Sequence, residues 1–274
     1  MGTSQSKPDG PPNSLLIPPW AEQEPPPPWA RPAEENDDQQ STSQVATSPE
    51  LARAEPRRYA DFRTELGRYA QSGSRNAARS ALGHWARISV GGASFGARRL
   101  TRAARTSGAA ISALASISAG QAPPPGSLDV RSLAGLPTDL AVDRIVDAFC
   151  PSGIPDQDLI RIAMTEALVV ALADNDNFDP ASIDGDAIRV ITLTLVAELV
   201  FLSVAGDAGN ALDASPSPIA AVQRETDLRS LIREVTDVEG TPILNSVGNV
   251  LPPDAVASLV SRLIETVETE MATW

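Results

Sequence analysis

Few side chains in this sequence are of the types that carry out catalysis or bind metals. His84 is the only histidine and Cys150 the only cysteine among the 274 residues. A zinc site needs several such ligands together, and a nucleophilic cysteine needs a nearby base. Because the two residues lie far apart in the sequence, we expect His84 to be a partly packed side chain. Cys150 stands at a predicted helix end, before Pro151, and is expected to be a small buried apolar residue.

Two further segments have some features of a binding loop. Residues 174–179 begin with the alternating oxygen ligands of a calcium loop. However, Phe178 and Asp179 stand where the pattern requires an oxygen ligand and a glycine, so we expect a solvated turn. The glycines of residues 91–96 are not followed by the Gly-Lys-Ser/Thr sequence of a phosphate-binding loop. The sequence therefore predicts a protein that is not an enzyme and that holds no metal or cofactor.

Arginine is concentrated in residues 57–110, which hold eleven arginines and only two acidic residues, although the net charge of the chain is −13. With its interleaved aromatic residues, this segment could contact the phosphates and bases of a nucleic acid. It could instead neutralise the acidic C-terminal part of the chain or face an acidic partner protein. We favour these protein contacts because nucleic acid repels a strongly acidic chain at long range. The predicted basic patch consists of Arg98, Arg99, Arg102 and Arg105.

The elements that must position these residues are predicted to be helices. Hydrophobic residues make up 42% of the chain but aromatic residues only 4%, a composition that favours small-residue helix packing over an all-β core. We expect an Arg-rich helical segment over residues 57–122, a linker at Pro123-Pro124-Pro125-Gly126, and an all-α globular domain over residues 127–274. Its predicted helices cover about residues 137–149, 155–173, 184–204, 219–235 and 256–271. The apolar run of residues 187–205 includes two charged residues, which favours a buried core helix over a membrane span.

Residues 1–56 are predicted to be a disordered tail. They are acidic and rich in proline, which lacks an N–H group and fixes φ. Two apolar groups interrupt the tail, one at Leu16, Ile17 and Trp20 and one at Trp29. They are either docking anchors for a partner or segments that pack on the chain's own helices, and both interpretations stay open. With one cysteine and no secretory signal, the sequence predicts a cytoplasmic protein.

The first residues, Met1-Gly2-Thr3-Ser4-Gln5-Ser6, fit the pattern for N-myristoylation. The acidic residues Asp9, Glu22 and Glu24 follow soon after and disfavour contact with an anionic membrane. A single acyl chain would bind a membrane only marginally. We therefore expect no membrane attachment.

The same start, followed by Leu15-Leu16-Ile17-Pro18-Pro19-Trp20-Ala21, resembles the QatB family, a component of the bacterial Qat anti-phage defence system. The motifs cover roughly residues 1–30, and the remainder agrees in general character, with an Arg-rich middle and a helical end. The resemblance implies three partners: an ATPase, a QueC-like enzyme and a TatD-like nuclease. QueC enzymes adenylate a 7-deazaguanine carboxylate and attach nitrogen to it, and a QueC-like partner could use a protein α-amine instead.

Gly2 has the properties that such a modification needs. A small Gly2 followed by Thr3 permits removal of Met1, and the exposed α-amine has a pKa of about 7.7–8.0, which leaves a useful neutral fraction at pH 7. Glycine also has no side chain to block a narrow pocket. On the resemblance, we expect Gly2 to be modified by the QueC-like partner. The residues expected to bind partners are Thr3, Ser4, Ser6, Leu16, Ile17, Trp20 and Trp29.

Overall fold

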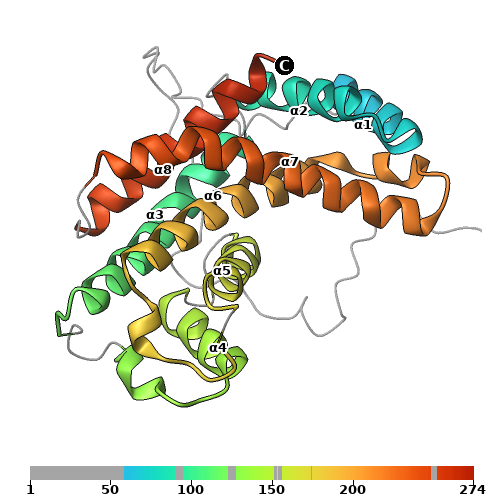
Figure 1. The fold of residues 1–274 in the computed structure, drawn as a ribbon. Helices are drawn as coiled ribbons and strands as arrows, with labels where there is room; N and C mark the ends of the chain where they lie inside the picture. Colours follow the sequence, from blue (N-terminus) through green and yellow to red (C-terminus); the bar gives the residue numbers. More distant parts are fainter. Residues whose placement is uncertain are drawn as a thin grey trace, which may run out of the picture. The chain divides into compact units, whose positions relative to one another are not determined.

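The computed structural model describes residues 59–90, 95–122, 128–150, 153, 156–173, 175–247 and 252–274. Over these ranges the chain forms α-helices and short 3-10 helices and no strand, which confirms the predicted all-α fold (Figure 1). The α-helices are α1 (Ala60–Ser72), α2 (Arg75–Val90), α3 (Phe95–Ser118), α4 (Thr138–Phe149), α5 (Gln157–Ala171), α6 (Gly185–Ala208), α7 (Pro218–Asn245) and α8 (Pro253–Ala272). The 3-10 helices are η2 (Val130–Leu133), η3 (Pro180–Ser182) and η4 (Ala211–Ala214).

Helices α1 and α2 form a pair whose sharp turn depends on Gly73. This glycine ends α1 in the left-handed region at φ 66°, where a residue without Cβ is favoured. Phe62, Leu66 and Tyr69 lie three and four residues apart on one face of α1, and all three are buried, as their spacing predicts. The next helix is anchored by Trp85, whose Nε1 donates to Oδ2 of Asp207 in α6 at 2.9 Å.

Helices α6 and α7 lie side by side along much of their length (Figure 1). Asp184 begins α6 because its carboxylate accepts hydrogen bonds from the backbone N–H groups of Asp186 and Ala187. Among the described helices, α6 alone is long and apolar enough to cross a membrane, but 67% of its most apolar window is buried within the fold. The prediction that this apolar run is a buried core helix, which was based on its two charged residues, is therefore confirmed.

Helix α7 continues to Asn245, so the predicted end near residue 235 was wrong. The sequence there contains Gly240 and Pro242, which are residues that usually interrupt a helix. Gly240 lies close to α6, because a Cβ atom at this position would lie only 2.5 Å from Cδ2 of Leu193, and that side chain would have to shift. The close contact between α6 and α7 therefore accounts for a glycine that, from the sequence alone, would be expected to end the helix.

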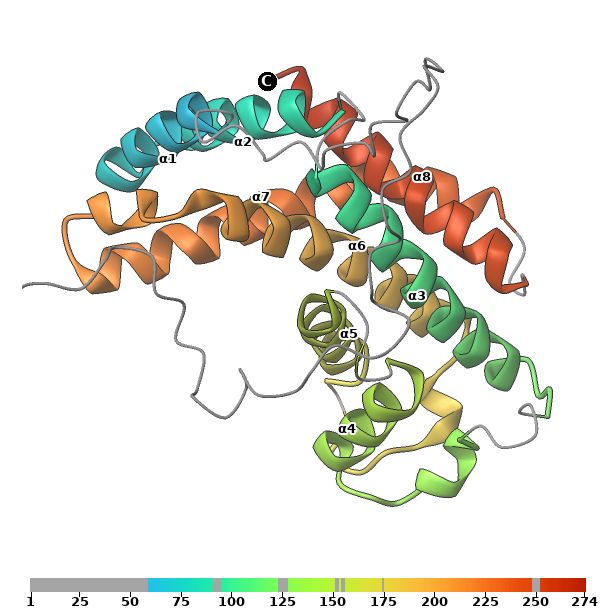
Figure 2. The ribbon, with the colours of Figure 1, turned by 180° about the vertical axis from the view of Figure 1, so that it is seen from behind.

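Helices α3 and α8 run antiparallel and lie side by side (Figures 1 and 2). The backbones approach closely at Gly108, where a Cβ atom would lie 2.6 Å from Cα of Ala257. The predicted helix at residues 256–271 is confirmed as α8, and its buried face is a stripe at three- and four-residue spacing that includes Val256, Val260, Leu263, Ile264, Val267 and Met271. Helices on both sides of the predicted linker thus contribute to one hydrophobic cluster, while residues 123–127 lie outside the described ranges.

Residues 175–179, which follow α5, form a turn with one buried side chain. Phe178 is buried, its N–H donates to the carbonyl of Leu136 at 2.8 Å, and its carbonyl accepts from Gly135 at 2.9 Å. The carboxylate of Asp179 caps η3. Asp176, Asn177 and Asp179 are exposed, as expected for a solvated turn. The segment also holds the start of α4, because the carbonyl of Asp176 accepts from the N–H of Thr138 at 3.1 Å.

Candidate functional site

The predicted modification and docking residues all belong to the N-terminal tail. Gly2, Thr3, Ser4, Ser6, Leu16, Ile17, Trp20 and Trp29 lie outside the described residues. Their roles therefore remain predictions from the sequence.

The predicted basic patch lies in the first three turns of α3. The backbone places Arg98, Arg99, Arg102 and Arg105 in this helix, and the side chains of the last two are described and exposed. The Nη1 atom of Arg102 lies 3.2 Å from Oδ2 of Asp156, a residue at φ 62° in the left-handed region that aspartate tolerates better than most residues. Arg105 lines a polar groove of about 450 Å³ between α3 and α8, where Arg262 contributes a second guanidinium. Hydroxyl groups of Thr101, Ser258 and Ser261 and carboxylates of Asp254 and Glu265 complete its lining.

Other arginines of the basic segment bind within the chain. Arg63 Nε donates to the carbonyl of Asp207 and Arg87 Nη1 to that of Ala272, both at 2.9 Å. Arg75 forms an ion pair with Glu234. The guanidinium of Arg79 lies 4.5 Å from the ring centroid of Trp274. These contacts favour the interpretation in which the arginines serve the acidic C-terminal part of the chain.

The two residues first considered for catalysis are poorly placed for it. Burial raises the pKa of the Cys150 thiol to about 11, and the nearby Arg161 lowers that pKa by a smaller amount. The thiolate, which is the nucleophilic form, is therefore scarce at neutral pH. His84 is half-buried in α2, and no group of three His, Cys, Asp or Glu side chains in the described part of the chain could hold a metal ion.

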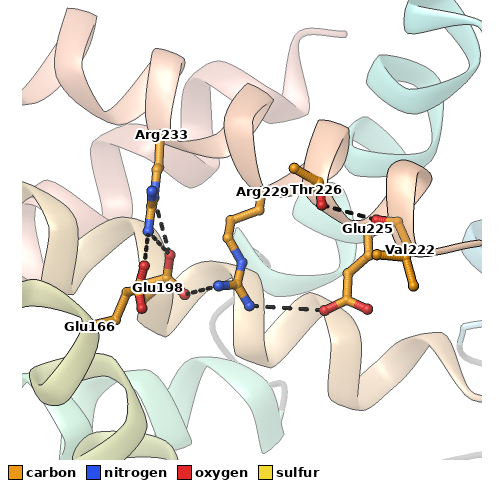
Figure 3. A network of polar contacts seen from close by, with 7 residues as sticks. All are labelled: Glu166, Glu198, Val222, Glu225, Thr226, Arg229 and Arg233. Atoms are coloured by element: carbon orange, nitrogen blue, oxygen red, sulfur yellow. Dashed lines mark hydrogen bonds and ion pairs between the residues drawn. The ribbon is translucent and has the colours of Figure 1, made fainter. Parts of the chain in front are cut away.

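Sequence reasoning missed a charge network that joins α5, α6 and α7 (Figure 3). Its centre is Glu198, which is only 1% exposed in the middle of α6. Arg233 Nη2 donates to Glu198 Oε1 at 2.8 Å and to Glu166 Oε1 at 2.7 Å. On the other side, Arg229 Nη1 lies 3.7 Å from Glu198 Oε2, and its guanidinium stacks 4.4 Å from the ring centroid of Phe201. One buried carboxylate is thus held between two arginines.

The two carboxylates of the network stabilise the charged form of Arg233. Burial by itself would lower the pKa of Arg233, but hydrogen bonds to Glu166 and Glu198 outweigh that effect and raise the pKa. The arginine is therefore always charged, and Glu198 has a permanent counter-charge. The signal in the sequence was Glu198 itself, a carboxylate in an apolar run, since a buried charge requires a partner.

A second buried carboxylate lies between α2 and α8. The hydroxyl of Ser89 donates to Glu268 Oε1 at 2.5 Å, and Glu268 is 5% exposed. Burial raises the pKa of Glu268 to about 7, the hydrogen bond from Ser89 lowers it by less, and the charge of Glu265 raises it further. The buried carboxylate of Glu268 therefore exchanges its proton near neutral pH.

Comparison with known families gives a match over residues 91–268, to the family described as Qat anti-phage system associated protein QatB. This range covers well over half of the chain. The chain belongs to the QatB family. The matched region runs from the segment before α3 almost to the end of α8, so the Glu198 network and the basic patch lie inside the QatB match. No curated protein and no solved structure matches the chain.

Membership of the QatB family makes the chain a component of an anti-phage defence system. The resemblance seen at residues 1–30 is confirmed by a region that does not overlap it, since the QatB match begins only at residue 91. Two separate parts of the chain therefore point to the same family.

Proposed function

We propose that this QatB family member is a non-catalytic component of its defence system and that a QueC-like partner modifies its Gly2. The observation that carries the proposal is the start Met1-Gly2-Thr3-Ser4-Gln5-Ser6 on a chain whose later residues match QatB. The partners proposed from the family are the QueC-like enzyme, an ATPase and a TatD-like nuclease, acting in the cytoplasm.

The proposed reaction is acyl transfer to the α-amine of Gly2. The partner would first adenylate the carboxylate of a 7-deazaguanine. The neutral amine of Gly2 then attacks the activated carbonyl carbon, a C–N bond forms, the C–O bond to AMP breaks, and the amine loses a proton. The product is an amide at the N-terminus. An α-amine pKa of about 7.7–8.0 keeps part of the nucleophile neutral at pH 7.

Intact-mass measurement of the chain co-expressed with its neighbouring genes tests this proposal. We expect a mass increase on Gly2 that requires the QueC-like enzyme. Gly2→Pro, which makes the amine secondary and hindered, should abolish the increase. Gly2→Ala is the matched control, because it keeps a primary amine and should remain at least partly modified. An unmodified Gly2 in the complete system would refute the proposal.

The second candidate function is an adaptor whose Arg-rich segment binds nucleic acid or an acidic partner. The observation in its favour is Arg105, which is exposed in the groove between α3 and α8 beside Arg262. A nucleic-acid adaptor should bind in a salt-sensitive way and lose affinity when Arg98, Arg99, Arg102 and Arg105 become Glu. If the chain retains neither DNA nor RNA at low salt, nucleic-acid binding is refuted. Binding to an acidic partner protein would then be the adaptor function that remains.

A further inference from the structure

A cavity of about 620 Å³ lies where the C-terminal ends of α3 and α7 meet the N-terminal ends of α6 and α8. Its volume falls in the range of about 300–1,000 Å³ typical of small-molecule sites. None of its lining residues belongs to the Glu198 network, the basic patch or the N-terminal tail. The cavity is therefore separate from the Glu198 network, the basic patch and the N-terminal tail.

The inner wall of the cavity is apolar and built from four helices. Ile111 and Ala115 of α3 are buried, as are Leu244 of α7 and Val256 of α8, while Ile188 of α6 is half-buried. Side chains of this kind offer no hydrogen bond to water. An apolar ligand of matching size would therefore gain from burial here, at roughly 25 cal/mol per Å² of apolar surface.

The solvent side of the cavity carries charge. Arg131 and Arg189 line it and are exposed, as is Asp184. The carboxylate of Asp184 already accepts two backbone N–H groups at the start of α6. These hydrogen bonds hold the Asp184 carboxylate at the start of α6 but leave its negative charge in place. Arg131 and Arg189 are the lining groups on this side that attract an anion.

Both arginines are oriented by an aspartate that contacts only part of the guanidinium. Arg131 Nε donates to Asp129 Oδ1 at 3.0 Å, and Arg189 Nη1 donates to Asp186 Oδ1 at 2.9 Å. A guanidinium has five N–H donors in a planar fork. Within the described residues, no other hydrogen bond uses the remaining donors of Arg131 or Arg189. These donors suit a carboxylate, which guanidinium groups bind in a bidentate way.

We propose that this cavity binds an amphipathic carboxylate, with its apolar body against Ile111, Ile188 and Val256 and its anionic head at Arg131 or Arg189. The class of ligand is a medium-chain fatty acid or a compound of the same chemistry. The apolar wall supplies the affinity, and the arginines determine the preference for a negative charge. The site is independent of the modification of Gly2.

Isothermal titration calorimetry with decanoate tests the site, and decan-1-ol serves as the uncharged probe with the same apolar body. We expect saturable 1:1 binding of decanoate and binding of decan-1-ol that is about tenfold weaker, the factor that corresponds to about 1.4 kcal/mol. The double variant Arg131→Gln/Arg189→Gln should weaken decanoate binding by a similar factor and leave decan-1-ol binding unchanged. Arg144→Gln is the matched control, because Arg144 is an exposed arginine of α4 that does not line the cavity.

Filling the cavity provides the second arm of the test. Ala115→Phe places a ring in the space and should abolish binding of both probes. Ala181→Trp fills the same space from the exposed rim and replaces the first variant if a buried phenylalanine prevents folding. Absence of saturable decanoate binding to the wild-type chain, or binding that a folded cavity-filling variant leaves unchanged, overturns the proposal. Equal affinity for the two probes overturns the assignment of an anionic head.

Discussion

The Nη2 atom of Arg233 lies 2.8 Å from Oε1 of Glu198, although the two residues belong to different helices and are 35 positions apart in the sequence. The same nitrogen reaches Glu166, so one guanidinium ties α5, α6 and α7 together. A buried carboxylate is costly unless it is paired. The contact therefore stabilises the fold only when α6 and α7 keep this relative position.

Replacing Glu198 by alanine should destabilise the protein. The change removes the buried counter-charge that Arg229 and Arg233 share, although both arginines are about one third exposed and keep Glu225 and Glu166 as partners. We expect a loss of roughly 1–3 kcal/mol, which is typical when a group loses its charge-assisted hydrogen bonds. Chemical denaturation measures the effect. Glu234→Ala is the control, because Glu234 forms an exposed ion pair with Arg75 and its loss should cost about 1 kcal/mol or less. Similar effects of the two variants would contradict a structural role for the network.

Glu268→Gln should stabilise the protein in a pH-dependent way. Burial raises the pKa of Glu268 from 4.5 to about 7. Between these values the folded state binds more protons than the unfolded state, so wild-type stability falls as the pH rises from 4.5 through 7. Glutamine keeps an oxygen that can accept from Ser89 and has no charge to bury. The variant should thus be more stable by roughly 1–3 kcal/mol at pH 8, and the difference should shrink toward pH 5.

Thermal unfolding of both proteins over this pH range tests the Glu268 prediction. Asp143→Asn serves as control, because it removes one negative charge from the exposed side of α4, and Asp143 does not contribute to the pKa shift of Glu268. It should change stability much less at pH 8. A stability difference between Glu268→Gln and the wild type that stays constant from pH 5 to pH 8 would show that Glu268 does not titrate in this range.

Much of the fold is predictable from local patterns in the sequence. The stripe from Val256 to Met271 predicts α8 because apolar residues at three- and four-residue spacing form one helical face. Asp184 and Gly73 mark a helix start and a helix end by mechanisms that involve only neighbouring residues. Such features need no knowledge of how distant segments meet.

The features that could not be predicted depend on contacts between distant segments. Glu166 and Arg233 lie 67 positions apart, and nothing in either local sequence indicates the other. Gly240 suggests a helix end until its contact with Leu193 is known. The cavity behind Arg131 and Arg189 arises where several helix ends meet, and no sequence pattern marks such a space.

Gly108→Ala should destabilise the fold by forcing α3 away from α8. The added Cβ would lie 2.6 Å from Cα of Ala257, a backbone atom that cannot move aside alone. We expect a loss of about 1–3 kcal/mol, as is typical of overpacking. Gly67→Ala is the matched control, because the nearest atom would be 3.9 Å away and alanine favours helix. Denaturation midpoints that move in the same direction for both variants would contradict the close approach.

We expect a partner to hold the N-terminal tail through its two tryptophans. Trp20 and Trp29 are nine residues apart in a proline-rich segment, so they span at most about 28 Å at about 3.1 Å per residue in a polyproline II conformation. This spacing suits two separate pockets on one partner surface, with Leu16 and Ile17 extending the first contact. A buried aromatic anchor can contribute about 2 kcal/mol or more, which is about a thirtyfold change in affinity. Trp20→Ala and Trp29→Ala should each weaken partner binding by about this factor and leave the thermal midpoint of the isolated chain unchanged. A lowered midpoint with unchanged partner affinity would show that the two rings stabilise this protein's own fold.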